Sequence, residues 1–295
     1  MSKLSRILVP MDFSPAGERA LAHAAAIAAR TGAELHVLHV QELHRDMYGW
    51  AAIPDIEAVE KIIADQSRQD LDQAVAKIKP PVVHEIIRDI RAADAIVRYA
   101  EVREIDLIVM GTHARKGVVR MFMGSVAAAV VRDARVSVLI VGPEHILPTD
   151  LFRRILAPVD FSESAKAAVR QASAIAGQHD AELIVLHVVE PRILMPYDGM
   201  GGTLEQPREK AAAALGQWLD KASLPKPPAE VLVTLGPPDE QIVSHAREHT
   251  VDLIVMGTVG LSGMGRLLLG STTERVLRNA PCAVLAQRGE VHEDL

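Results

Sequence analysis

The chain has 295 residues, of which 49% are hydrophobic and 3% aromatic, with a formal net charge of −6 and a single cysteine. That length allows two ordinary domains with a core each. The acidic balance and the scarcity of aromatic residues argue against a nucleic-acid-binding protein, and one cysteine excludes a disulfide framework or a cysteine-based zinc site. No apolar run of about 18 residues occurs, so we expect no membrane span. The opening residues lack a signal-peptide pattern, and we expect a cytoplasmic protein.

Apolar runs alternate with helical patterns along the first half of the chain. The patterns predict strands over residues 7–10, 35–40, 82–87, 107–110 and 136–141, and helices over 15–30, 55–79, 92–102 and 125–133. The strands are continuous runs of Val, Ile and Leu, which is typical of parallel strands covered on both faces. Strands that alternate with helices predict a parallel sheet with helices on either side.

The second half of the chain repeats the first. The segment RILVPMDFS at 6–14 recurs as RILAPVDFS at 154–162, and DLIVMGT occurs unchanged at 106–112 and 252–258. The copies are 148 and 146 residues apart, too far for a solenoid repeat. We therefore predict a duplicated domain, with copies at 1–145 and 152–295. The expected fold class is α/β: two tandem open doubly wound parallel-sheet domains of the Rossmann-like kind.

Glycines gather beyond the carboxyl ends of the strands, where ligands bind in such sheets. In the second copy the strand LIVM leads to Gly257 and Gly260, and nine residues later Gly270 and Ser271 open a helix. The equivalent residues of the first copy are Gly111, Ala114, Gly124 and Ser125. Glycine lets an anion approach the backbone, a helix N-terminus offers free N–H groups, and either serine could cap its helix or donate a hydroxyl to phosphate. The spacing predicts a phosphate cradle.

The spacing G-x-x-G-(nine)-G-S after a strand ending in MG resembles the ATP-binding signature of the universal stress protein family. The opening ILxPxDFS and the strand LHV are similar to that family as well, and the resemblance covers the whole chain as a tandem two-domain member. It implies the adenine-nucleotide α-hydrolase-like form of the fold, with ATP, ADP or AMP at each sheet's switch point and Mg²⁺ held through the phosphates. It also implies antiparallel pairing of the last strands of the two copies. The chain would then be an intramolecular pseudo-dimer that could form a homodimer, with its protein partner unidentified.

Carried over by position, the resemblance gives each site residue a part of the nucleotide. Asp12 and Asp160 would lie against ribose or adenine, and the backbone of Val40 and Val188 would contact adenine. The strand-end glycines would admit ribose and phosphates, and the residues that open the last helix of each copy would hold the phosphates. The implied ATP-binding set is Pro10, Met11, Asp12, Val40, Met110, Gly111, Ala114, Gly124, Ser125 and Val126 in the first copy, and Pro158, Val159, Asp160, Val188, Met256, Gly257, Gly260, Gly270, Ser271 and Thr272 in the second.

The first copy departs from the family pattern in two places. Ala114 replaces the second glycine, and Ile90 stands where the second copy has Gly236. Arg115 and Lys116 could supply cationic phosphate contacts instead. We therefore expect the second site to bind nucleotide more tightly, while binding at the first site stays open.

Other conspicuous residues have ordinary structural explanations. His39 and His187 lie in apolar strands and are expected to be satisfied core histidines rather than catalytic groups. Asp12 and Asp160 could cap helices, contact the ligand, or do both. Cys282 falls in the last predicted strand and is expected to be a small buried residue.

The sequence offers no catalytic constellation that recurs in both copies. It has no repeated Ser-His-Asp order, no carboxylate pair near both cradles and no HExxH motif, and an ATPase needs a group that positions water or a base. The leading hypothesis is therefore a nucleotide-binding stress-response or regulatory protein. The alternatives are a slow ATPase or an adenylating enzyme on the same scaffold, and a nucleotide-free scaffold. An adenylating enzyme would need an SGGxDS-like loop where this chain has PMDFSPAG and PVDFSESA.

Overall fold

The computed structural model describes residues 4–42, 56–76, 78–79, 81–114, 121–142, 152–190, 205–258 and 269–288. The elements of the first copy are β1 (Arg6–Pro10), α1 (Pro15–Thr31), β2 (Glu34–Glu42), α2 (Ile56–Val75), β3 (Val82–Asp89), α3 (Ala92–Val102), β4 (Leu107–Gly111), β5 (His113–Ala114), β6 (Met121–Phe122), α4 (Ser125–Asp133) and β7 (Ser137–Val141). Those of the second are β8 (Arg154–Val159), α5 (Glu163–His179), β9 (Glu182–Val189), α6 (Glu205–Ala222), β10 (Glu230–Leu235), α7 (Pro238–Glu248), β11 (Leu253–Gly257), α8 (Ser271–Asn279) and β12 (Ala283–Gln287).

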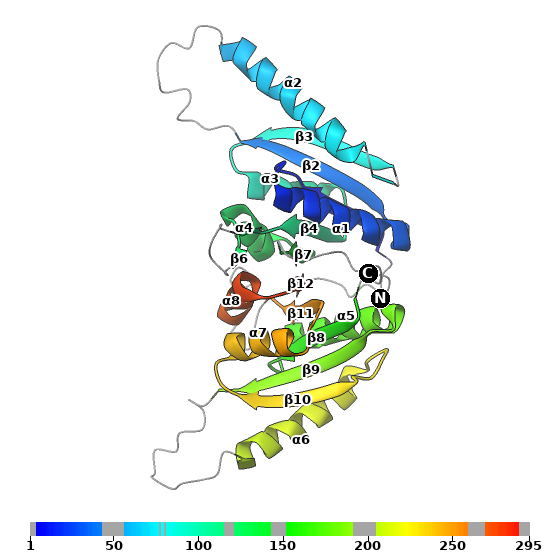
Figure 1. Ribbon diagram of the computed structural model, residues 1–295, viewed down its shortest axis with the longest axis vertical. Coiled ribbons are helices and arrows are strands. Elements are labelled where there is room, and N and C mark those ends of the chain that lie inside the picture. Colours follow the sequence, from blue (N-terminus) through cyan, green and yellow to red (C-terminus); the bar gives the residue numbers. More distant parts are fainter. Residues whose placement is uncertain are drawn as a thin grey trace.

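Ten of the strands form one continuous sheet along the length of the molecule (Figure 1), in the order β10-β9-β8-β11-β12-β7-β4-β1-β2-β3. Within each copy all neighbouring strands are parallel. Strand order reverses between β1 and β4 and again between β8 and β11, so each copy has a switch point there. The predicted doubly wound α/β topology is confirmed. The short β5 and β6 pair with each other outside this sheet.

The two copies join through their last strands. β7 and β12 pair antiparallel, with Leu139 opposite Leu285, Ile140 opposite Val284 and Val138 opposite Ala286. All six residues are buried. An exposed apolar edge strand would invite aggregation, and each of these two edges is covered by the other. The expected antiparallel pairing between the copies is therefore confirmed.

Helices cover both faces of the sheet. One buried cluster gathers side chains from α1, α2, α5 and α6 against alternate strand residues such as Ile7 and Leu107. The other gathers α3, α4, α7 and α8 against the intervening residues, such as Leu8 and Ile108. Strand side chains point to alternate faces, so a strand that is apolar throughout contributes to both clusters. The helices α2 and α6 lie towards the two ends of the molecule (Figure 1).

The aspartate that opens each repeated DLIVMGT segment holds two strands together. Asp106 Oδ2 accepts hydrogen bonds from the backbone N–H groups of Ser5 (2.7 Å) and Arg6 (2.9 Å). Asp252 does the same for Arg153 (2.8 Å) and Arg154 (2.9 Å). Asp106 therefore ties the start of β4 to the start of β1, and Asp252 ties β11 to β8 in the same way. This structural role accounts for the aspartate at the start of both DLIVMGT segments.

The structure corrects the predicted end of one helix and confirms the burial of the cysteine. The predicted helix 55–79 ends at Val75, because the N–H of Ile78 bonds to the Val75 carbonyl (2.9 Å) and closes a turn. Cys282 is buried as expected, and burial raises the pKa of its thiol. None of the helices in the described ranges is long and apolar enough to cross a membrane.

Candidate functional site

A cleft of about 280 Å³ opens at the carboxyl ends of the first copy's strands, beside the switch point between β1 and β4. The ends of β1, β2 and β4 form its floor, and the first residues of α3 and α4 form its sides. The structure brings nine of the ten predicted first-copy residues into its wall: Pro10, Met11, Asp12, Val40, Met110, Gly111, Gly124, Ser125 and Val126. The tenth, Ala114, lies in β5, just beyond the end of β4.

The turn between β1 and α1 is held by the predicted aspartate. Asp12 Oδ1 accepts hydrogen bonds from the backbone N–H (3.0 Å) and the hydroxyl (2.6 Å) of Ser14. Ser14 Oγ in turn accepts from the N–H of Gly17 (3.1 Å) and caps α1. Between them Phe13 adopts a left-handed conformation with φ of 56°, which is uncommon for a residue with a side chain. Asp12 therefore has a structural role at the helix cap, and contact with a ligand stays a prediction.

A histidine in the neighbouring strand supports the same turn. The Nδ1–H group of His39 donates to the Met11 carbonyl (2.8 Å), and the rings of His39 and Phe13 lie 4.6 Å apart. In the second copy His187 donates to the Val159 carbonyl (2.8 Å), with Phe161 at 4.5 Å. Both histidines are thus hydrogen-bonded to the backbone as the sequence predicts, but they are half-buried rather than core residues, and His39 lines the cleft.

The strand-end glycines have a packing role. A Cβ atom on Gly111 would lie 2.1 Å from the carbonyl oxygen of Ala16, and one on Gly257 would lie 2.5 Å from Ser164 Oγ. Real Cβ atoms do not approach other heavy atoms so closely, so a side chain at either position would push α1 or α5 away from the sheet. The close approach that requires glycine here is that of a helix, independently of any ligand.

Gly124 is different, because nothing lies within 4 Å of a Cβ atom built on it. Its φ of −60° also suits any residue, so the fold itself does not require glycine. Gly124 is the N-cap residue of α4, and Gly270 is that of α8; neither provides a side-chain cap. The expectation that Ser125 and Ser271 could be the caps is wrong by one position, since each serine is the first helical residue.

Backbone N–H groups are the donors that the first-copy cleft offers to an anion. The first N–H groups of a helix have no intrahelical acceptor, and in α4 these belong to the lining residues Ser125, Val126 and Ala127. Among the described lining residues there is no Lys or Arg. An anion would therefore be held by N–H groups and the positive end of the helix dipole. Arg115 and Lys116, the proposed cationic contacts, lie outside the described residues.

The second copy places its predicted residues at the equivalent edge. Pro158 and Val159 end β8, Asp160 follows, Val188 lies near the end of β9, and Met256 and Gly257 end β11, while Gly270, Ser271 and Thr272 open α8. Asp160 Oδ1 accepts from the N–H (3.0 Å) and hydroxyl (2.5 Å) of Ser162, which caps α5. Gly260 lies outside the described residues.

Two hydrogen bonds distinguish the cradle of the second copy. The N–H of Gly270 donates to the Thr258 carbonyl (2.9 Å), so it is not available to a phosphate in this conformation. Thr273 Oγ1 donates to the Gly257 carbonyl (2.9 Å) and ties α8 to the end of β11. The equivalent residue of the first copy is Ala127, which lacks a hydroxyl. The second cradle is thus braced by the protein itself.

Glu42 is a cleft residue that the sequence analysis missed. It ends β2, and its Oε1 accepts a hydrogen bond from the N–H of Ala92 (2.8 Å) at the start of α3. The second copy has Glu190 at the same position but Pro238 in place of Ala92, so that N–H does not exist. Glutamate occurs at this position in both copies, and that recurrence could have indicated the residue from the sequence.

Comparisons with known proteins agree on one family. The model of the Universal stress protein family matches residues 3–142 and again residues 151–288. A universal stress protein of Mycobacterium tuberculosis is 24% identical over 290 residues, which cover 96% of this chain and 96% of that protein. One from Thermus aquaticus is 37% identical over 141 residues, covering 47% of this chain and 100% of that protein. The crystal structure of a universal stress protein from Archaeoglobus fulgidus has the same fold, with a TM-score of 0.70 at 22% identity over 98% of this chain and 100% of that one.

Proposed function

Because this chain belongs to the universal stress protein family, we propose that it is an adenine-nucleotide-binding stress-response or regulatory protein. The proposed ligand is ATP, with ADP or AMP as alternatives, and Mg²⁺ would arrive with the phosphates. The site is the strand-end cleft of each copy. Its N–H groups and helix dipole would hold the phosphates.

The observation that carries this proposal is the open space beside Gly124. The fold does not need glycine there, whereas a ligand that approaches the N-terminus of α4 would need the side chain to be absent. The cleft is also lined by the apolar side chains of Val40, Ile96 and Met110, which would suit a planar base. Phosphates at α4 and the base near β2 would fit this distribution.

We also propose that the second copy binds more tightly. Its α8 is braced against β11 by Thr273, so less conformational entropy would be lost when the start of α8 binds phosphates. Gly236, with φ of 143°, and Gly260 leave that cradle freer of side chains than Ile90 and Ala114 leave the first. Ile90 is 58% exposed just before α3, where its side chain would narrow the approach of a nucleotide.

Turnover is expected to be slow. Both carboxylates in the first-copy cleft are already engaged, Asp12 by Ser14 and Glu42 by Ala92, so neither is poised as a base for water. With excess ATP and Mg²⁺, a rate of about 1–1000 per second would place the protein among ordinary enzymes and overturn the binding-protein proposal.

The direct test is to identify what the purified protein carries and what it binds. Denaturing the protein and measuring the released small molecules by mass is expected to yield ATP, ADP or AMP. Nucleotide-free protein titrated with Mg-ATP in a calorimeter should then give saturable binding. Absence of any released nucleotide, together with no heat of binding at about 1 mM ATP, where even a free energy of only about −4 kcal/mol gives half-saturation, would refute the proposal.

A further inference from the structure

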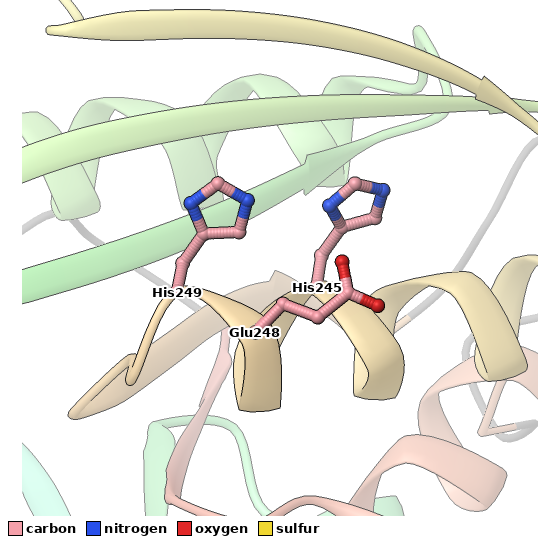
Figure 2. Close-up of side chains that lie close together, drawn as sticks. All are labelled: His245, Glu248 and His249. Atoms are coloured by element: carbon pink, nitrogen blue, oxygen red, sulfur yellow. The ribbon is translucent and has the colours of Figure 1, made fainter.

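The last turn of α7 and its C-cap residue carry three side chains that could share a metal ion. His245, Glu248 and His249 stand at i, i+3 and i+4, a spacing that places them on one face of a helix. Figure 2 shows the two imidazole rings side by side on that face, with the Glu248 carboxylate reaching towards His245. One ligand atom from each of the three lies within 4.8 Å of the other two.

One imidazole nitrogen of this cluster is left without a hydrogen-bond partner among the described residues. The rings of His245 and His249 are stacked, with centroids 5.7 Å apart and planes inclined by 27°. Nδ1 of His245 is buried and has no hydrogen-bond partner among the described residues. A buried polar atom without a partner costs stability unless something else satisfies the ring. Glu248 is exposed, and its Oε1 accepts a hydrogen bond from Ser244 (2.8 Å), which orients the carboxylate.

A fourth oxygen lies close by on the neighbouring strand. Oε2 of Glu230, at the start of β10, is 3.9 Å from Nδ1 of His249. β10 is the end strand of the sheet, and the segment after α7 is already fixed because Arg154 donates to the carbonyl of His249 (2.9 Å) and the hydroxyl of Thr250 (2.8 Å). The backbone that carries His249 is thus held in place, while the exposed carboxylates can rotate.

The duplicated fold supplies an internal comparison. The equivalent positions of α3, 146 residues earlier, hold Tyr99, Val102 and Arg103. Tyr99 shares a hydrogen bond with Nδ1 of His36 (3.0 Å), and Arg103 pairs with Glu85. In the first copy two of the three positions are therefore paired with other side chains, and the third, Val102, is exposed. The second copy has three metal-ligating side chains there instead, so the common fold does not require them.

We propose that His245, Glu248 and His249 bind a divalent transition-metal ion of the Zn²⁺ class, with Glu230 as a fourth ligand. Two imidazoles and a carboxylate are ligands that Zn²⁺ accepts in tetrahedral sites, with bonds of about 2.0–2.2 Å, and imidazole also suits Cu²⁺ and Ni²⁺. Rotation of the exposed Glu248 and Glu230 side chains would bring the donors together. The ion would tie the last turn of α7 to β10.

The proposed site is separate from the nucleotide cleft. α7 begins with Pro238, just after the carboxyl end of β10, and ends with Glu248. Asp252 follows shortly afterwards and directly precedes the start of β11. The cluster therefore lies at the end of the sheet where strands begin, opposite the end where nucleotide would bind. Loss of metal binding and loss of ATP binding would be independent results.

The test uses tag-free full-length protein, freed of metal with a chelator and titrated with Zn²⁺ alone at about pH 7.5, where imidazole is neutral. The expected result is one saturable site per chain and a rise in the melting temperature that saturates with it. His249→Gln and Glu248→Gln should each weaken this binding by about 10-fold or more, since even loss of an outer-sphere partner costs 10–100-fold. Co²⁺ in place of Zn²⁺ should give visible absorption that both variants lose.

The matched control is His84→Gln. His84 occupies the position in β3 that corresponds to Glu230 and pairs with Asp72 (3.0 Å), so it is an imidazole–carboxylate pair outside the cluster. This variant should bind Zn²⁺ as the parent protein does. Glu248 is exposed, so its variant should fold normally, as the circular dichroism spectrum without metal would verify. If the parent protein shows no saturable Zn²⁺ binding, or if Glu248→Gln and His249→Gln bind as tightly as the parent, the assignment is wrong.

Discussion

The two copies agree at the turn after their first strand and differ at several other positions around the cleft. The aspartate–serine bond is 2.6 Å in one copy and 2.5 Å in the other, and the histidine–carbonyl bond is 2.8 Å in both. Phe13 and Phe161 take the same left-handed conformation. Such agreement between the two copies indicates that this turn has a structural role in the domain.

The differences lie where a ligand would be held. In the second copy Thr273 ties α8 to the end of β11, whereas the equivalent residue of α4 in the first copy, Ala127, has no hydroxyl to make that bond. The start of α3 offers the Ala92 N–H to Glu42, and α7 begins with a proline instead. The copies thus share a scaffold and vary in groups that would lie close to a bound nucleotide, which is the arrangement expected if the two sites have unequal roles.

The largest expected effect tests this inequality directly. Gly270→Glu should remove the tighter phase of ATP binding, and Gly124→Glu should leave it. A carboxylate at the helix N-terminus would occupy the phosphate position and repel its charge, which we expect to cost at least about 100-fold in affinity, or about 2.7 kcal/mol. Titration calorimetry resolves the two phases.

The alanine variants of the same glycines measure the steric part of the effect, because they add a side chain where the ligand would approach but no charge. Both glycines have φ near −60°, so substitution introduces no backbone strain. If Gly124→Glu removes the tighter phase instead, the first copy is the principal site and the ranking is reversed.

The strand-end glycines should differ in how badly they tolerate a methyl group. Gly111→Ala would place Cβ against a backbone oxygen of Ala16, which cannot move without α1, and we expect a loss of about 2–3 kcal/mol. Gly257→Ala would place Cβ 2.5 Å from Ser164 Oγ and 2.8 Å from the Ser164 backbone carbon, a less severe approach than at Gly111, and should cost less. Thermal melting checks the order, since about 1 kcal/mol corresponds to about 2–4 °C at this size.

Gly216→Ala provides the control for the glycine pair. Gly216 is exposed in α6 and a Cβ atom there would meet nothing within 4 Å, so alanine should stabilise the helix by about 0.5–1 kcal/mol. Equal losses at Gly111 and Gly257 would show that the shorter approach at Gly111 adds no cost and that the packing of α1 and α5 is equivalent.

A side chain without a counterpart in the first copy clamps the two halves together. Arg288 donates to the carbonyls of Ala134 (2.9 Å) and Arg132 at the end of α4, and Gly142 stands at its place in the first copy. Burial lowers the pKa of this guanidinium, although an arginine stays charged at neutral pH. Arg288→Ala should cost about 1.5 kcal/mol, the lower end for bonds of a charged donor, because the side chain is only half-buried.

The control for Arg288 is an arginine with an exposed ion pair. Arg275 lies 3.4 Å from Asp239 on the surface, and Arg275→Ala should change stability by less than about 1 kcal/mol. Melting temperatures of the two variants that fall by the same amount would mean that the clamp contributes no more than a surface charge.

The sequence predicted the regular elements well because their signals are local. The bounds of α3 and α4 follow from helical periodicity, and the parallel sheet follows from the run of apolar strands. The end of α2 was missed by four residues, since the turn that closes it depends on a backbone bond between Val75 and Ile78 that no side chain announces. The cap of α4 was missed by one residue because Gly124 and Ser125 are both plausible caps.

Contacts between distant residues could not be read in the same way. That Gly111 is required by Ala16, 95 positions earlier, depends on how closely α1 packs on β4. The bond from Ala92 to Glu42 joins residues 50 positions apart. The cluster of His245, Glu248 and His249 is local, and its helical spacing is visible in the sequence. It has no counterpart in the first copy, so the repeat of the two copies gives no sign of it.

The smallest expected effect concerns the part of the molecule on which the two copies agree. Ser14→Ala and Ser162→Ala each remove a helix cap and should cost about 1 kcal/mol. Ser162 is 8% exposed and also bonds to Ser164 Oγ (3.0 Å), so its loss should be the larger of the two. Threonine at either position retains the hydroxyl and should restore most of the stability.

Each alanine variant also removes one hydrogen-bond donor from the neighbouring aspartate, whose carboxylate is then held less firmly beside the proposed nucleotide. Ser14→Ala should therefore weaken only the looser ATP phase, and Ser162→Ala only the tighter one. Melting temperatures and calorimetry of both pairs separate the two effects. An alanine variant as stable as the parent protein would mean that the left-handed phenylalanine and its histidine hold the turn without the cap.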